Sequence, residues 1–204
     1  ATLNGLSYTP VNNYNGADTL TVSAEDADGF TTAAISTVSI TVNAVNDAPV
    51  NTLPAGFTVP EDTPVTLTGL SFSDVDSGTL TVDFTATGGT LSATAAGAAI
   101  VGGSGSELSI TGTITDINNT LSTVTYLTAA DFVGSVTLTM ATDDGELTDT
   151  DTATITVTEV NDAPTAINNL NVTTTPGSVS EDGGTITITA ADLIANDITG
   201  PANE

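Results

Sequence analysis

The chain has 204 residues, of which 25 are acidic and none is Lys, Arg or His, so its formal net charge is -25. This charge excludes a nucleic acid as partner, because phosphates would be repelled, and an anionic membrane surface is unfavourable for the same reason. No stretch reaches the roughly 20 apolar residues that cross a bilayer, so direct membrane insertion is not expected. The 39% of apolar residues and the many Thr and Val residues favour β structure with buried cores.

Two stretches of the chain follow the same pattern. Residues 8–49 and 126–164 align Tyr8 with Tyr126, contain an acidic turn, and end in Asn-Asp-Ala-Pro. The distance between these two endings is the length of a whole domain rather than of a solenoid repeat. We therefore expect three units: the C-terminal part of a repeat at 1–49, a complete repeat at 50–164, and the N-terminal part of a further repeat at 165–204.

Apolar residues alternate with threonine in several short segments between Gly- and Asp-rich turns. Leu80, Val82 and Phe84 share one face of such a segment, and this period of two is typical of a strand with one solvated face. The predicted fold class is all-β, with tandem antiparallel β-sandwich domains of immunoglobulin-like Greek-key type joined end to end. Strands are expected to begin near Phe57, Val65 and Thr79, and to cover 135–141 and 152–159.

Two segments depart from this pattern. The phrase Asp-Ile-Asn-Asn-Thr-Leu at 116–121 predicts one helical turn, with Asp116 as its cap and Ile117 and Leu121 four residues apart. Residues 94–106 are rich in Gly, Ala and Ser, and they predict a loose hairpin or loop.

Alternating strand direction gathers the acidic loops at the two ends of the complete repeat, beside the linkers. The linkers end in Pro49 and Pro164, which fix φ and bias the preceding residue towards an extended conformation. One predicted joint gathers Asn46, Asp47, Asp74, Asp76, Asp143 and Asp144. The other gathers Glu61, Asp62, Asp131, Asn161 and Asp162, with Asp197 as a further candidate from the third unit. Glu181 and Asp182 are the counterparts of Glu61 and Asp62 in that unit.

Crowded carboxylates repel one another unless cations intervene. Calcium takes six to eight oxygen ligands in flexible geometry, and the aspartates supply anionic oxygen while Asn46 and Asn161 add neutral carbonyl oxygen. Without cysteine or histidine, a zinc or copper site is disfavoured. The sequence therefore predicts calcium as the cofactor, stiffening both joints.

Four kinds of acidic phrase mark the turns and linkers: Val-Asn-Asp-Ala-Pro at 45–49 and 160–164, Pro-Glu-Asp at 60–62, Ser-Asp-Val-Asp-Ser at 73–77, and Asp-Asp-Gly-Glu at 143–146. In these phrases and their order, the chain resembles the cadherin-like tandem repeats of large secreted bacterial adhesins. The resemblance covers essentially the whole chain and implies ions held between domains. It gives metal roles to Glu61, Asp62, Asp47, Asp162, Asp74, Asp76, Asp143 and Asp144. The chain lacks the longer acidic linker motif of animal cadherins, and the third unit has Ala-Ala-Asp-Leu-Ile-Ala-Asn-Asp in place of the Asp-Val-Asp loop.

The resemblance and the charge together predict a structural role outside the cell. We expect a calcium-stiffened extender, or stalk segment, of a secreted bacterial adhesin, with neighbouring repeats and further copies of the chain as partners. Two alternatives stay open: a self-assembling filament or surface-layer subunit, and a module that binds carbohydrate or protein. An enzyme is not expected, because there is no histidine, cysteine or lysine to act as base or nucleophile. A glycosidase-like pair of carboxylates is the remaining alternative, but it needs one carboxyl in an apolar pocket, and the candidates lie in polar turns.

Three other interpretations of the same residues remain. The acidic phrases are also ordinary β-turn sequences, and acid spread over the whole surface is typical of halophilic adaptation. The placement of acid in loops rather than on strands favours a metal. Regular threonine rows are compatible with ice binding, but they are more often solvated strand residues.

Overall fold

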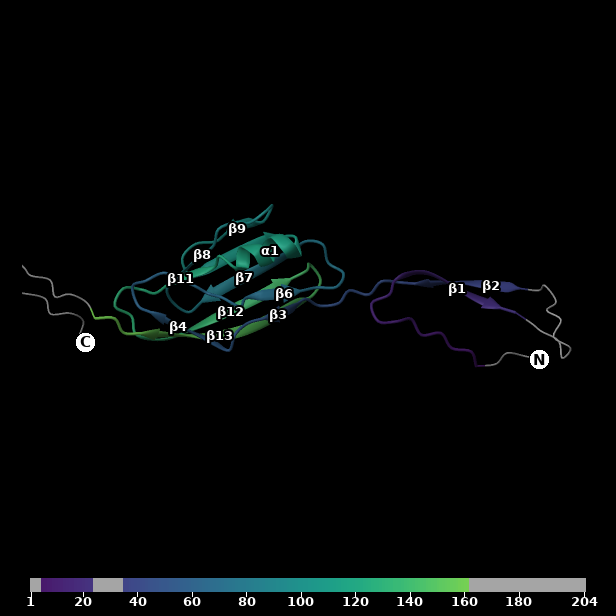
Figure 1. The fold of residues 1–204 in the computed structure, drawn as a ribbon, viewed down its shortest axis with the longest axis horizontal. Helices are drawn as coiled ribbons and strands as arrows, with labels where there is room; N and C mark the ends of the chain where they lie inside the picture. The colour runs from purple at the N-terminus through teal and green to yellow at the C-terminus, as the bar shows by residue number, and fades with distance from the viewer. Residues whose placement is uncertain (1–4, 24–34, 162–204) are drawn as a thin grey trace, which may run out of the picture.

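The computed structural model describes residues 5–23 and 35–161, and β-strands make up most of its regular structure (Figure 1). The single helix in this part of the chain is α1 (Ile114–Leu121). The predicted all-β class is confirmed at this level. The strands are β1 (Gly16–Val22), β2 (Ser36–Val42), β3 (Val50–Thr52), β4 (Gly56–Pro60), β5 (Val65–Thr66), β6 (Ser71–Ser73), β7 (Leu80–Ala86), β8 (Thr90–Ser92), β9 (Ile100–Gly102), β10 (Glu107–Gly112), β11 (Thr125–Leu127), β12 (Gly134–Asp143) and β13 (Thr148–Thr158).

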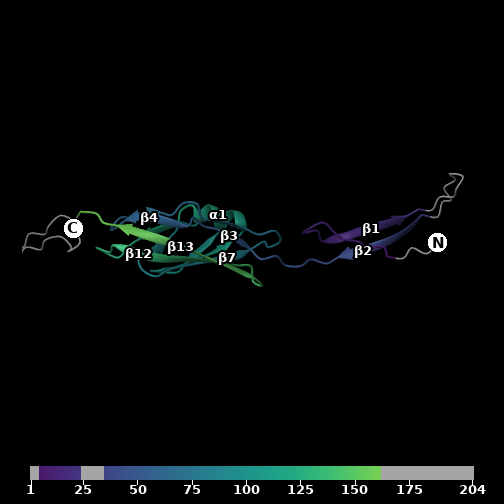
Figure 2. The same cartoon turned by 90° about the horizontal axis from the view of Figure 1, so that it is seen from below.

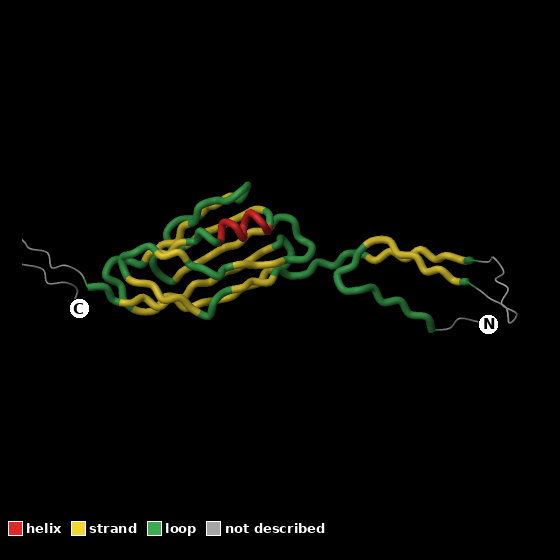
Figure 3. The backbone as a smooth tube through the Cα atoms, in the orientation of Figure 1, coloured by secondary structure: helices red, strands yellow, loops and turns green. Residues whose placement is uncertain are grey.

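Six strands form the main sheet in the order β4-β13-β12-β7-β10-β9, drawn in yellow in Figure 3. The period-two prediction is confirmed, since Leu80, Val82 and Phe84 of β7 are buried while the alternate residues face solvent. Neighbouring strands are antiparallel with one exception. β4 pairs in parallel with β13, which corrects the expectation of antiparallel pairing throughout.

A second layer covers the apolar face of this sheet. It consists of the three-stranded sheet β5-β11-β8, the two-stranded sheet β3-β6, and α1. Leu67, Ile117 and Tyr126 of this layer belong to the same buried cluster as Phe84 and Leu138 of the main sheet. Burying a large apolar side chain contributes about 1.5–3 kcal/mol, so this shared core holds the two layers together.

The helix begins one turn earlier than the sequence predicted. Its N-cap is Thr113, whose hydroxyl accepts the backbone N–H of Asp116 and donates to the Asp116 carboxylate. Asp116 is therefore the third helical residue rather than the cap, and the pair resembles a capping box. Ile117 and Leu121 are buried on one side of the helix, as their spacing predicted.

Of the two alternatives predicted for residues 94–106, the hairpin is the one observed, because β9 pairs antiparallel with β10 across the loop at 103–106. Outside the complete unit, β1 and β2 form an antiparallel hairpin that projects along the long axis of the molecule (Figures 1 and 2).

The predicted unit boundaries at 1–49, 50–164 and 165–204 and the tandem Greek-key arrangement stay predictions. Asp162, Glu181, Asp182 and Asp197 lie outside the described residues. Within that described part, no helix is long and apolar enough to span a membrane.

Candidate functional site at the two joints

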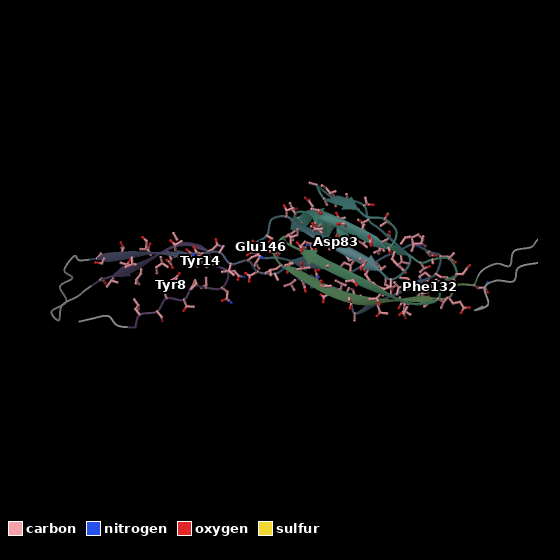
Figure 4. The ribbon with its side chains drawn as sticks, turned by 180° about the vertical axis from the view of Figure 1, so that it is seen from behind. Tyr8, Tyr14, Asp83, Phe132 and Glu146 are labelled. Carbon is pink, nitrogen blue, oxygen red and sulfur yellow. The ribbon has the colours of Figure 1, made fainter. Side chains whose placement is uncertain are left out.

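The loops predicted to meet do lie together, at opposite ends of the complete unit. Figure 4 shows Glu146 at the end that faces the β1–β2 hairpin and Phe132 at the other end. We call the first end, with Asn46, Asp47, Asp74, Asp76, Asp143 and Asp144, the N-terminal joint. We call the second, with Glu61, Asp62, Asp131 and Asn161, the C-terminal joint.

At the N-terminal joint, the linker is hydrogen-bonded to two loops of the complete unit. Asn46 Nδ2 donates to Asp144 Oδ2 at 2.8 Å, and the backbone N–H of Asp47 donates to Asp76 Oδ2 at 3.2 Å. The Asp74 carboxylate holds its own loop, because its Oδ1 accepts the N–H groups of Asp76 and Ser77. Asp74 Oδ2 is buried without a hydrogen-bond partner.

The two aspartates between β12 and β13 hold their own turn. Asp144 Oδ1 accepts the N–H groups of Glu146 and Leu147, both at 2.7 Å, and Asp143 accepts from Gly145 N–H and the Thr148 hydroxyl. The Leu147 N–H, followed by the Asn46 amide and the Glu146 N–H, lowers the pKa of Asp144 below its usual value. The turn interpretation of these residues is therefore observed, and their role as metal ligands stays a prediction.

A third anchor of the linker was missed by the sequence analysis. Asn51 of β3 is buried. Its backbone N–H donates to Asp149 Oδ2 at 2.7 Å, and its Nδ2 donates to the Asp149 carbonyl at 2.9 Å. The Thr142 hydroxyl donates to Asn51 Oδ1. A polar residue two positions after Pro49 is the one signal for this anchor, and nothing in the sequence distinguishes it from an exposed asparagine.

The C-terminal joint contains a fully buried carboxylate. Glu61 follows β4 directly; its backbone N–H donates to the Thr158 carbonyl at 3.0 Å, and its Oε1 accepts the N–H of Val160 at 2.9 Å. The whole residue is 0% exposed, and its Oε2 has no hydrogen-bond partner. An ionised carboxylate without a partner is costly to bury, and this chain has no cationic side chain to offset it.

Two residues beside Glu61 have left-handed backbone conformations. Asp62 has φ 56° and Asp131 has φ 54°. The loops that carry them are joined, because the N–H of Asp131 donates to Asp62 Oδ1 and the N–H of Asp62 donates to the Thr128 hydroxyl. Such conformations are uncommon for residues other than glycine and persist where the surroundings enforce them. The loop of Asp131 and the turn of Glu61 and Asp62 therefore form one fixed end of the unit.

Acidic side chains alone do not complete a metal site in the described part of the chain. No group of three or more of them lies close enough to hold an ion there. A calcium site at either joint would need backbone or amide oxygens as well. The buried Oε2 of Glu61 nevertheless fits such an ion, because it is an anionic oxygen that lacks a donor.

Comparisons with known proteins define no family for this chain. No protein-family model and no curated protein matches it. Among solved structures, it is similar to domains 4 and 5 of the S-layer protein SbsC, with 18% identity, a TM-score of 0.33, and coverage of 72% of this chain and 70% of that one. It is also similar to the endo-fucoidan hydrolase MfFcnA4 of glycoside hydrolase family 107, with 18% identity and a TM-score of 0.31.

A second hydrolase of that family, MfFcnA9, matches with 19% identity and a TM-score of 0.24. The chain covers 21% of MfFcnA4 and 23% of MfFcnA9, so it spans about a fifth of the hydrolases it matches. The sequence-based exclusion of enzymes is wrong as stated, since 79% of this chain matches part of an enzyme. At these TM-scores the likeness is one of β-rich folds and assigns no activity to this chain.

Proposed function

We propose that this chain is an extended spacer segment of a secreted or surface-exposed bacterial protein, stiffened by calcium at its joints. Its part is to keep successive β domains in line and so hold an adhesive tip away from the cell. The observation that carries the proposal is Glu61, a fully buried carboxylate with one unpartnered oxygen in a chain without basic residues.

Calcium would supply the positive charge that Glu61 lacks. Glu61 Oε1 already accepts the Val160 N–H, so an ion on Oε2 would connect β4 to the linker that leaves β13. Asp62 and Asp131 lie in the adjoining loops, and Asn161 and Asp162 follow Val160 in the sequence. These residues would complete the oxygen set that calcium prefers.

The same ion would restrict bending at the C-terminal joint. Without it, like charges around Glu61 repel one another and favour an open linker. With it, the carboxylates and the linker share one centre, and Pro164 further limits rotation of the chain. The resulting segment is stiff in calcium and more flexible after chelation.

Calcium titration tests the proposal. Extracellular modules bind calcium at about 10⁻⁴ to 10⁻³ M, and at tenfold excess over the dissociation constant one site adds about 1.4 kcal/mol of stability. We expect a rise in Tm of about 5 °C or more per site, measured by calorimetry, and a longer maximum dimension in small-angle scattering.

A pair of variants identifies the site. Glu61→Gln removes one negative charge at the joint, and Glu107→Gln removes the same charge from an exposed position on β10. We expect the calcium-induced rise in Tm to shrink in the first variant and to be unchanged in the second. A wild-type protein whose Tm and shape are the same in calcium and in chelator would refute the proposal.

A further inference from the structure

β9 forms one edge of the six-stranded sheet, and β10 is its only strand partner in the part of the chain that is described. It lies at the outer margin of the fold (Figure 1). The opposite edge, β4, is bounded by Pro54 and Pro60, and proline removes the backbone donor that a further strand would need. β9 contains no proline and no charged residue, two of the devices that protect an edge from pairing, although its length of three residues limits the number of hydrogen bonds to a partner strand.

The sequence that contains β9 is uncharged over an unusual length, and the carboxylates nearby belong to Glu107, at the start of β10, and to Asp116, which lies against Gly97. No charged residue occurs between Asp83 and Glu107. Elsewhere, two copies of a chain with a net charge of -25 would set carboxylates against carboxylates, with no basic residue to offset them. Of the two edges of the six-stranded sheet, β9 is therefore the one at which two copies approach with less repulsion.

The side chains of β9 suit such an approach. Val101 packs against the core, whereas Ile100 is 70% exposed. Ile100 lies opposite Thr111 of β10, which in turn lies opposite Thr81 of β7. A large apolar side chain at an edge, next to neutral threonines, can bury its surface against a partner strand.

The segment that leads into β9 is held in place before any partner arrives. The Thr123 hydroxyl accepts the N–H of Thr94 and donates to its carbonyl, and the Ala96 N–H donates to the Thr120 hydroxyl at 2.9 Å. Gly97 has a left-handed backbone conformation and lies against the Asp116 carboxylate of α1, which a side chain at this position would displace. Because these contacts order the segment in the single chain, pairing at β9 involves little further loss of entropy.

We propose that β9 is a homotypic pairing edge, at which β9 of a second copy adds in antiparallel orientation. The two six-stranded sheets then form one continuous sheet across an isologous interface. The strands run roughly along the long axis of the molecule (Figure 1). Two-fold pairing therefore sets the copies side by side with their β1–β2 hairpins at opposite ends, as in stalks that extend from two facing surfaces.

Sedimentation equilibrium of the full chain tests this pairing, in calcium and in chelator, at about 0.15 M salt to screen the net charge. A reversible dimer is expected in both conditions, since no ion takes part. Ile100→Asp places like charges next to each other across the interface and should weaken the dimer about tenfold. Thr58→Asp adds the same charge to exposed Thr58 on β4 and should leave the dimer unchanged.

Cross-linking provides a second measurement. The chain has no cysteine, so Ile100→Cys introduces a single thiol beside the expected two-fold axis. Oxidation should give a covalent dimer for Ile100→Cys and none for Thr58→Cys. A chain that stays monomeric at all concentrations, equal effects of the two Asp variants, or a dimer that needs calcium would each overturn the inference. The calcium dependence of Tm is a separate readout, so either proposal can fail alone.

Discussion

The two joints carry the same Asn-Asp-Ala-Pro phrase but differ in how their carboxylates are satisfied. At the N-terminal joint, Asp143 and Asp144 accept hydrogen bonds from their own turn, and Asn46 donates to Asp144. At the C-terminal joint, Glu61 is buried with one oxygen unpartnered. The turn of Asp143 and Asp144 at the first joint is held by hydrogen bonds that the chain makes itself, although Asp74 Oδ2 there also lacks a partner, and the proposed ion would act on the fully buried Glu61 at the second joint. Identical linker phrases therefore lie beside carboxylates that differ in burial, since Glu61 is fully buried and Asp74 is only partly buried.

The largest difference between calcium and chelator should come from removing the charge of Glu61. An unpaired buried charge costs several kcal/mol, and the replacing amide buries an unpaired NH₂ group at a cost of about 1–3 kcal/mol, so in chelator Glu61→Gln should be more stable than the wild type by about 1–2 kcal/mol. In saturating calcium the order should reverse, because the variant loses an anionic ligand. Chemical denaturation in calcium and in chelator measures the unfolding free energies of the variant and the wild type and so tests this reversal. A variant less stable than the wild type in both would mean that the joint needs no cation.

The N-terminal joint should respond to loss of its buried amide. Asn51→Ala leaves the Asp149 carbonyl and the Thr142 hydroxyl without their partner, which should cost about 2 kcal/mol. The loss should be the same with and without calcium, as measured by denaturant unfolding. Asn119→Ala, at an exposed position on α1, is the control and should be nearly neutral. If the stability lost in Asn51→Ala depended on calcium, the N-terminal joint would also respond to an ion, and the proposed difference between the two joints would be wrong.

The smallest effect concerns acid. The pKa of Asp144 is lowered in the folded chain, so its contribution to stability is present above the unfolded pKa and is lost as the pH falls through the lowered value. Asp144→Asn keeps an oxygen for the Leu147 N–H but does not titrate. Its Tm should therefore fall less than that of the wild type between about pH 6 and about pH 3. Asp83→Asn, on the exposed face of β7, is the control, and an equal change in both variants would argue against the assignment.

The sequence predicted the long strands well because many alternating residues define them. The predicted segment 135–141 lies within β12, which extends from Gly134 to Asp143, and the predicted segment 152–159 matches β13 up to Thr158, with β13 beginning earlier at Thr148. Strands of three residues, such as β3, β6 and β9, carry too few residues for a period to show. Which loops meet at each end followed from strand direction alone, and hydrogen bonds such as that between Asp47 and Asp76 agree with it.

The burial of Glu61 could not be predicted in the same way. It arises because β4 pairs in parallel with β13, which brings the chain at Thr158 and Val160 over Glu61. A glutamate in Pro-Glu-Asp is locally a turn residue, and only the long-range pairing encloses it. Likewise, Thr113 and Ile114 continue the alternation of threonine and apolar residues in β10, so the pattern does not mark the start of the helix and favours the acidic residue three positions later as the cap.

The parallel pair β4–β13 also determines how this unit would carry a mechanical load. The N-terminal linker leads through β3 into β4, and β13 leads into the C-terminal linker. Tension between the two linkers would pull these neighbouring strands in opposite directions along their shared row of pairs, from Thr154↔Gly56 to Thr158↔Pro60. The hydrogen bonds would then be sheared together rather than opened one after another, so the unit would yield only when the whole row gives way.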